Sequence, residues 1–119
     1  MMIERRLSLI RNPDSKRLLI KVGVGIPYRP ARLPGFEKLA GCLVHTGVED
    51  AGEREVFGVD ELQALASALS NIDMFLKALA SRGRLLWEDG REYDPSTENI
   101  FANDPSEILD AILRKYLPK

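Results

Sequence analysis

Cysteine and histidine are scarce in this 119-residue sequence, which holds one of each, Cys42 and His45. A single cysteine excludes a disulfide within the chain and leaves a thiolate zinc site without its other ligands. A single histidine excludes the common two- and three-histidine metal sites. The two residues are three apart on a predicted strand, so without a bulge they point to opposite faces and cannot form a nucleophile pair. We expect a buried Cys42, a strand-end or partly exposed His45, and no catalytic residue, metal or cofactor.

Long apolar runs are also missing, since none approaches the roughly 18 residues that a membrane-spanning helix needs. The start of the chain has a basic pair but no apolar stretch after it, unlike a secretory signal. Hydrophobic residues make up 45% of the chain and charged residues 29%, which excludes a disordered protein. We therefore expect a cytoplasmic protein without membrane contact, folded as a single domain over 1–119, with the sheet and main helix in 1–90.

Net charge is small, at −1, but it is unevenly distributed. Residues 1–46 hold nine Lys or Arg against three Asp or Glu, whereas residues 47–119 hold eight against fifteen. Such asymmetry can mark a basic binding face, but the favoured interpretation is that the two halves neutralise each other in the fold. Nucleic-acid-binding domains are usually basic overall, which argues against a nucleic-acid partner.

Alternating apolar residues predict two strands, at 3–10 and 18–24, which a turn at 12–15 joins into an antiparallel hairpin. Residues 25–38 hold three prolines and two glycines, so they form a long connection rather than an element. Further strands are predicted at residues 39–46, 53–57 and 85–88, and residues 91–103 read as irregular.

The clearest helix is predicted at about 61–82. Asp60 is a good N-cap, and Gln63 stands at capping-box spacing from it. Gly58 ends the preceding strand, and Gly83 is expected to close the helix in the left-handed conformation. The apolar stripe predicted to face the sheet consists of Leu62, Leu65, Leu69, Ile72, Leu76 and Leu79.

A second helix is predicted at about 105–117, because Asp104 caps a start with proline at its first position and glutamate at its third. It would pack on the same core or on a partner chain. The order of elements predicts an α+β fold: an antiparallel sheet of four or five strands, packed on one face by the 61–82 helix.

The segment from Phe57 to Leu69, FGVDELQALASAL, resembles a family of small uncharacterised bacterial domains with a helix start of the form (Y/F)GVDxxQAL. The opening Glu4-Arg5 and the stretch from Gly23 to Pro27 are similar to the earlier part of that family's pattern. The resemblance covers roughly residues 2–90. It implies a bacterial source and no assigned activity, so it transfers no catalytic residue to this chain.

Two groups of residues are candidate interaction surfaces. Carboxylates cluster around one turn without the spacing of a calcium loop, so a solvated, aggregation-resistant edge is the favoured interpretation and an acidic docking face the alternative. The proline-rich loop supplies aromatic and basic side chains. The two groups are Glu49, Asp50, Glu53 and Glu55, and Tyr28, Arg29 and Arg32.

These observations favour a non-enzymatic module that binds an as yet unknown protein, for example an accessory protein of the immunity type. The alternative is a binder of small molecules or single-stranded nucleic acid that uses the basic N-terminal hairpin and the 25–38 loop. An enzyme built from scattered charged residues ranks third, because a spatial cluster need not show in the sequence. The sequence is also compatible with a two-fold homodimer.

Overall fold

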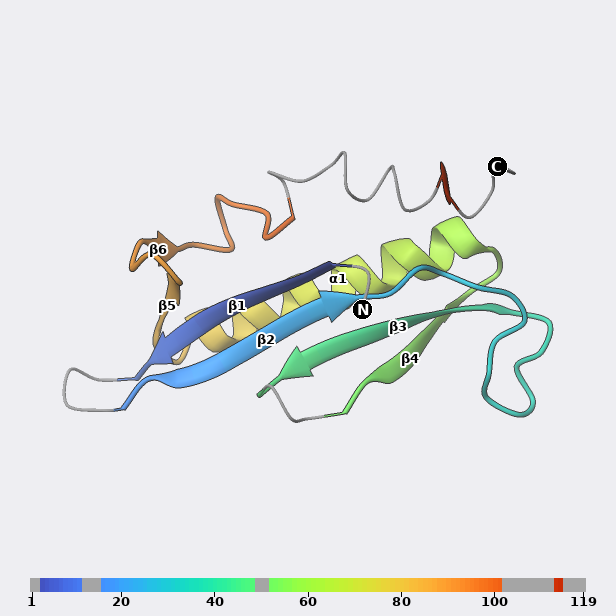
Figure 1. Ribbon diagram of the computed structural model, residues 1–119, viewed down its shortest axis with the longest axis horizontal. Coiled ribbons are helices and arrows are strands. Elements are labelled where there is room, and N and C mark those ends of the chain that lie inside the picture. Colours follow the sequence, from blue (N-terminus) through green and yellow to red (C-terminus); the bar gives the residue numbers. More distant parts are fainter. Residues whose placement is uncertain (1–2, 12–15, 49–51, 102–112, 115–119) are drawn as a thin grey trace.

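The computed structural model describes residues 3–11, 16–48, 52–101 and 113–114. These form an α+β fold with one antiparallel sheet of six strands in the order β4-β3-β2-β1-β5-β6 and one long helix (Figure 1). The elements are β1 (Ile3–Ile10), β2 (Leu18–Val24), β3 (Ala40–Gly47), β4 (Arg54–Gly58), α1 (Glu61–Ala80), β5 (Arg84–Trp87) and β6 (Glu92–Tyr93).

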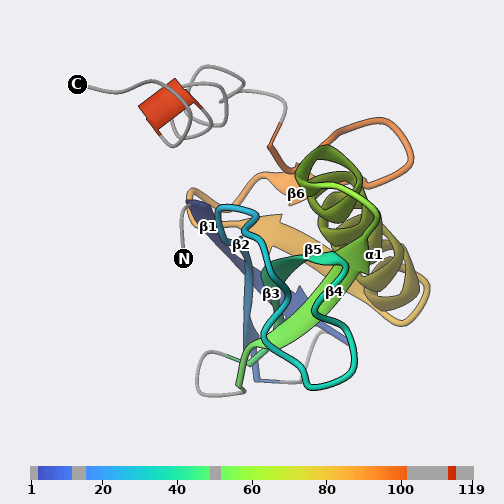
Figure 2. The same ribbon diagram turned by 90° about the vertical axis from the view of Figure 1, so that its right-hand side faces the viewer.

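The predicted hairpin is confirmed, with Leu7 of β1 opposite Ile20 of β2. After β4 the chain returns across the sheet through α1 and adds β5 on the free side of β1, where Leu9 faces Leu85. Figure 2 shows α1 along one face of the sheet. The connection therefore carries the chain from the β4 edge to the β1 side without a break in the antiparallel pairing.

One face of the sheet and one side of α1 form the core. Side chains alternate between the two faces of a strand, and the apolar side chains that β1 and β2 give to the core share one parity in each strand: Ile3, Leu7 and Leu9 in β1, and Ile20, Val22 and Val24 in β2. α1 packs mainly against β3 and β4, and Ile100 and Phe101 complete the core. The largest fully buried side chains are Leu7, Val22, Val24, Cys42, Val44, His45, Ile72, Leu76 and Leu85.

The helix begins as predicted. The Asp60 carboxylate accepts from the Gln63 backbone N–H at 2.8 Å, and this bond satisfies one of the free donors of the first turn. The Gln63 amide oxygen accepts from Val59 N–H at 2.6 Å, one residue before the cap rather than at the cap itself. Gly58 is the last residue of β4 and is buried under this turn.

The predicted end of the helix is wrong. α1 ends at Ala80, Ser81 is its C-cap in right-handed geometry, and Gly83 is not among the glycines with positive φ. Gly83 is needed for another reason: a Cβ there would lie 2.6 Å from the carbonyl oxygen of Ile10. Close approach of the backbone to β1, and not a left-handed cap, therefore requires glycine.

The sheet has more strands than the four or five expected, because Glu92–Tyr93 forms β6 within the segment predicted to be irregular. This strand depends on its pairing with Leu85 and Leu86. No local sequence pattern predicts that pairing. The second helix predicted at 105–117 lies, except for residues 113–114, outside the described residues. No helix in the described part of the chain is long and apolar enough to cross a membrane.

Gly58→Ala is expected to destabilise the fold. A Cβ at this position would lie 2.6 Å from the Gln63 carbonyl carbon, so the α1 start must move away from β4. We expect a loss of about 1–3 kcal/mol in the free energy of unfolding, measured by urea denaturation. Gly52→Ala is the matched control, because nothing lies within 4 Å of its Cβ and it should change stability by less than about 0.5 kcal/mol. Equal effects of the two substitutions would contradict this account.

Candidate functional site

The 25–38 loop is held against the sheet by its own backbone. Tyr28 and Gly41 exchange hydrogen bonds in both directions at 2.9 Å, and Ala31 N–H donates to the Leu39 carbonyl at 2.8 Å. The first part of the loop therefore extends the line of β2 beside β3. Figure 1 shows the loop at the same end of the molecule as the start of α1.

The tip of the loop is a tight turn. Phe36 N–H donates to the Leu33 carbonyl at 3.1 Å, with Pro34 at the second position and Gly35 at the third with a φ of 91°. Proline followed by glycine with positive φ is the signature of a type II turn. The sequence of the tip thus dictates its shape.

One carboxylate anchors the loop to the sheet. Glu55 of β4 accepts hydrogen bonds from the Tyr28 hydroxyl, from Arg32 N–H at 2.9 Å and from Leu33 N–H at 3.1 Å. A Cβ at Gly41 would lie 2.5 Å from the carboxylate and 3.0 Å from the Tyr28 ring, so β3 needs glycine there. We call Glu55 and its three donors the loop anchor.

The anchor shifts the titration of both of its side chains. Burial and the hydrogen bond to Glu55 raise the pKa of Tyr28 well above its ordinary value. Partial desolvation acts to raise the pKa of the Glu55 carboxyl, but the Tyr28 hydroxyl and the amides of Arg32 and Leu33 outweigh it and lower that pKa. The Arg32 guanidinium lies 4.5 Å from the centre of the Tyr28 ring, a cation–π contact that adds to the anchor.

The structure joins two groups that the sequence left separate. Glu55 and the loop residues Tyr28 and Arg32 form one cluster, so Glu55 is not merely part of a solvated edge. Glu53 is exposed and takes no part in it, and the acidic residues at positions 49 and 50 fall outside the described residues. Arg29 bridges the loop to the helix start by donating to the carbonyls of Lys38, at 2.8 Å, and Val59, at 2.9 Å.

Above the anchor lies an apolar surface that the sequence did not predict. The Phe36 ring stacks on Phe57 of β4 at 4.7 Å between centroids. The prediction that Leu62 lies on the core-facing stripe of the helix is wrong, because its side chain is 74% exposed, whereas Ala64 and Leu65 of the same turn are buried. We define the loop-end surface as the exposed side chains Leu33, Phe36, Val59 and Leu62.

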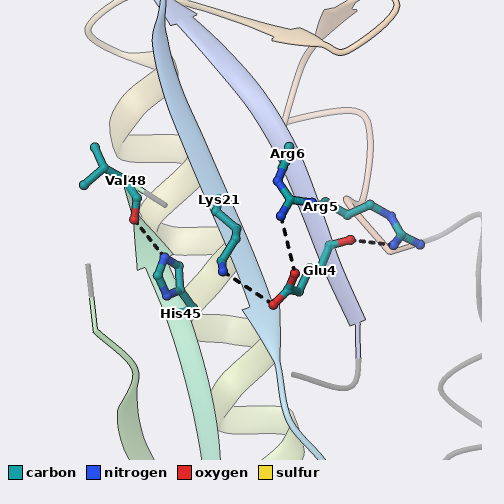
Figure 3. A network of polar contacts seen from close by, with 6 residues as sticks. All are labelled: Glu4, Arg5, Arg6, Lys21, His45 and Val48. Carbon is teal, nitrogen blue, oxygen red and sulfur yellow. Dashed lines mark hydrogen bonds and ion pairs between the residues drawn. The ribbon is translucent and has the colours of Figure 1, made fainter. Parts of the chain in front are cut away.

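A second feature is a cavity of about 360 Å³ where β5 leaves β1. A smaller one of about 180 Å³ adjoins it and shares Arg6 and Glu88 in its lining. The Glu4 carboxylate stands between Lys21 Nζ at 3.5 Å and an Arg6 guanidinium nitrogen at 3.9 Å (Figure 3). The larger cavity is lined by Glu4, Arg5, Arg6, Trp87, Glu88, Asp89 and Arg91.

Trp87 closes one wall of the larger cavity and packs edge-on against Tyr93 at 5.2 Å between ring centroids. Its indole N–H is buried and has no hydrogen-bond partner in the described part of the chain. Burial raises the pKa of Tyr93 to about 12, so its hydroxyl is neutral at physiological pH. Its Oη donates to the Glu98 carbonyl at 3.3 Å.

Cys42 and His45 do not form a reactive pair. Cys42 is fully buried, as predicted, with its sulfur 3.2 Å from the Gly25 carbonyl. The expectation of a partly exposed His45 is wrong: only 2% of it is exposed, and its Nε2 lies 2.9 Å from the Val48 carbonyl (Figure 3). Among the described residues, no group of three or more His, Cys, Asp or Glu side chains could hold a metal ion.

Comparison of the chain with protein-family models, curated proteins and solved structures gave no match. The resemblance seen at the helix start therefore stays a prediction, and function rests on the two features just described.

The loop anchor should make stability depend on pH. The folded-state pKa of Glu55 is lowered, so its stabilising effect is present above the unfolded-state value of about 4.3 and is lost as the pH falls through the folded value. Glu55→Gln should lower the free energy of unfolding by about 1–3 kcal/mol near pH 7. This difference from the native protein should shrink below a pH of about 4.

The control for this measurement is Glu53→Gln, which removes the same charge from an exposed residue just before β4. Urea denaturation over a pH series should show almost no effect of that substitution. If both variants follow the same pH dependence, Glu55 is not the anchor.

Proposed function

We propose that this chain is a non-enzymatic protein-interaction module that binds a partner protein through the loop-end surface. The observation that carries the proposal is the combination of a loop fixed by the Glu55 anchor and a set of large apolar side chains of the loop and the helix start that are left exposed. The proposal includes a cytoplasmic location and an accessory role, of which an immunity-type protein is one example.

Preorganisation supports this function. The three hydrogen bonds to Glu55, together with the two carbonyl contacts of Arg29, hold the loop in one shape before any partner arrives. A surface that is already ordered loses little conformational entropy on binding, so more of its contact energy appears as affinity.

The composition of the surface also supports it. Exposed fractions are 48% for Leu33, 39% for Phe36, 61% for Val59 and 74% for Leu62. Single exposed apolar residues are common, but neighbouring ones rimmed by polar groups mark interaction sites. Arg29 and other charged loop residues supply such a rim, so the chemistry expected of the partner is an apolar anchor flanked by polar groups.

The nucleic-acid alternative has less support. Single-stranded binding needs exposed aromatic faces on which bases can stack. The Tyr28 ring carries the Arg32 guanidinium over it, and its hydroxyl is held by Glu55. The basic residues of the hairpin, such as Arg6 and Lys21, border the cavities beside β1, away from the loop tip.

The proposal predicts that Leu33→Glu combined with Leu62→Glu abolishes partner binding. Two charges placed in an apolar contact would have to be desolvated, so capture should fall by about tenfold or more. The measurement is quantitative affinity capture from the native cell, with light scattering to detect binding of a second copy.

Met74→Glu is the matched control, because Met74 is 67% exposed on α1 outside the loop-end surface and should retain capture. Thermal denaturation should confirm that all variants fold. A double variant that captures or self-associates like the native chain would refute the proposal.

A further inference from the structure

The face of the sheet that α1 does not cover is hollowed between β1 and β2. Leu7 and Ile20 lie opposite each other in these strands and give their side chains to the core. Because side chains alternate between the two faces of a strand, the neighbours of these residues along each strand point to the opposite face. Together with Leu7, Ile20 and Glu88, these neighbours line the smaller cavity, of about 180 Å³: Arg6, Ser8, Leu19 and Lys21. We call it the hairpin cavity.

Ser8 is the one uncharged polar side chain of this lining, and only 9% of it is exposed. Across the strands it stands between Leu19 of β2 and Leu86 of β5, so its neighbours on both sides are apolar. Its hydroxyl has no hydrogen-bond partner among the described residues. A hydroxyl can donate one hydrogen bond and accept two, and burying it without a partner is unfavourable. The cavity therefore offers a ligand one hydrogen-bonding group in apolar surroundings.

The charges around the hairpin cavity are balanced. The Glu4 carboxylate lies 3.5 Å from Lys21 Nζ and 3.9 Å from an Arg6 guanidinium nitrogen, so both cations turn toward it (Figure 3). Only 16% of the Lys21 side chain is exposed, and its aliphatic stem adds to the apolar wall. The exposed carboxylate of Glu88 in the lining is the second negative charge. A charged ligand would disturb this balance, whereas a neutral ligand would not.

We propose that the hairpin cavity binds a small neutral phenol, with the hydroxyl of the ligand on Ser8 Oγ and its ring against Leu19. An apolar cavity of about 150 Å³ holds a benzene ring, so a cavity of about 180 Å³ accommodates one ring with its hydroxyl. An aromatic ring suits the site better than an aliphatic one, because the neighbouring cations of Arg6 and Lys21 are attracted to an aromatic face.

The surroundings favour a free molecule over a side chain of a partner protein. The centre of a protein interface is poor in charged residues. Three charged side chains line the hairpin cavity, those of Arg6, Lys21 and Glu88. A partner protein that inserted a side chain here would remove water from these charges, which is unfavourable. A single ring would leave them in contact with water.

Binding of 4-methylphenol to the whole chain, followed by NMR, tests the proposal. We expect saturable shifts of the amides of residues 6–8 and 19–21, and contacts between the ring protons and the Leu19 methyl groups. Ser8→Ala should weaken binding about fivefold, because one hydrogen bond is lost. Toluene has the same ring without the hydroxyl, so it should bind the native chain and the Ser8→Ala variant equally.

Leu19→Ala is a second variant, which removes part of the apolar wall and should weaken binding of both ligands about fivefold. Leu18→Ala is the matched control. Leu18 is 45% exposed and does not line the cavity, so its substitution should change binding by less than about twofold. Thermal denaturation should confirm that all three variants fold.

The absence of saturable shifts at the cavity would overturn the proposal, and so would equal shifts at Leu33 and Phe36, which would show adsorption to any exposed apolar residue. Equal affinity for toluene and 4-methylphenol would refute the role of Ser8. Tighter binding of 4-methylbenzoate would show an anion site instead. Equal binding of N-acetyltyrosine amide would point to a side chain of a partner protein and would also overturn the proposal.

This inference goes beyond the loop-end surface and does not depend on it. The variant carrying Leu33→Glu and Leu62→Glu should bind 4-methylphenol like the native chain, and Ser8→Ala should leave protein capture through the loop-end surface intact. Failure of one proposal is therefore distinguishable from failure of the other.

Discussion

Among the described residues, one long helix packs against a sheet of six strands, and it is too narrow to cover the whole of one face. α1 packs mainly on β3 and β4, so other side chains have to cover the core-facing side of the remaining strands. Ile100 and Phe101 extend the core beyond the helix. On the opposite face, the 25–38 loop folds back over β3 and β4, where the Tyr28 ring crosses Gly41.

The loop anchor shows how one polar side chain can hold a loop against a sheet. Glu55 receives two backbone N–H groups and one hydroxyl, so donors that a folded loop would otherwise leave unpaired are satisfied by one carboxylate. Because the loop is held from its polar side, its apolar residues Leu33 and Phe36 face outward. The proposed binding surface is therefore a consequence of how the loop is attached.

The cavity between β1 and the turn after β5 also follows from how two segments of the chain are paired. β5 has four residues and β1 has eight, and the turn at Gly90 leads the chain into β6 on the far side of β5, so β5 pairs with only part of β1. The cavity, the ion pairs around Glu4 and the buried indole N–H of Trp87 all lie at this mismatch. A difference in strand length thus creates a recess without any insertion in the chain.

The features of this structure that depend on neighbouring residues could be predicted from the sequence. Alternation identified β1 and β2, the Asp60 cap set the start of α1, and the α+β class followed from the order of elements. Each of these depends on residues within a few positions of one another. The resemblance at the helix start and the interaction function are predictions that the structure leaves open.

Only the tertiary structure decided the rest, because those features depend on pairing between distant segments. Glu55 meets Arg32 across 23 positions, and no local pattern distinguishes it from the exposed Glu53. Periodicity placed Leu62 on the apolar stripe, but which side of the first helical turn faces β3 and β4 depends on how α1 packs on them, and the buried side holds Ala64 and Leu65. His45 is buried and Gly83 is required for the same reason: their neighbours, the Val48 carbonyl and the Ile10 backbone, are brought to them by the fold.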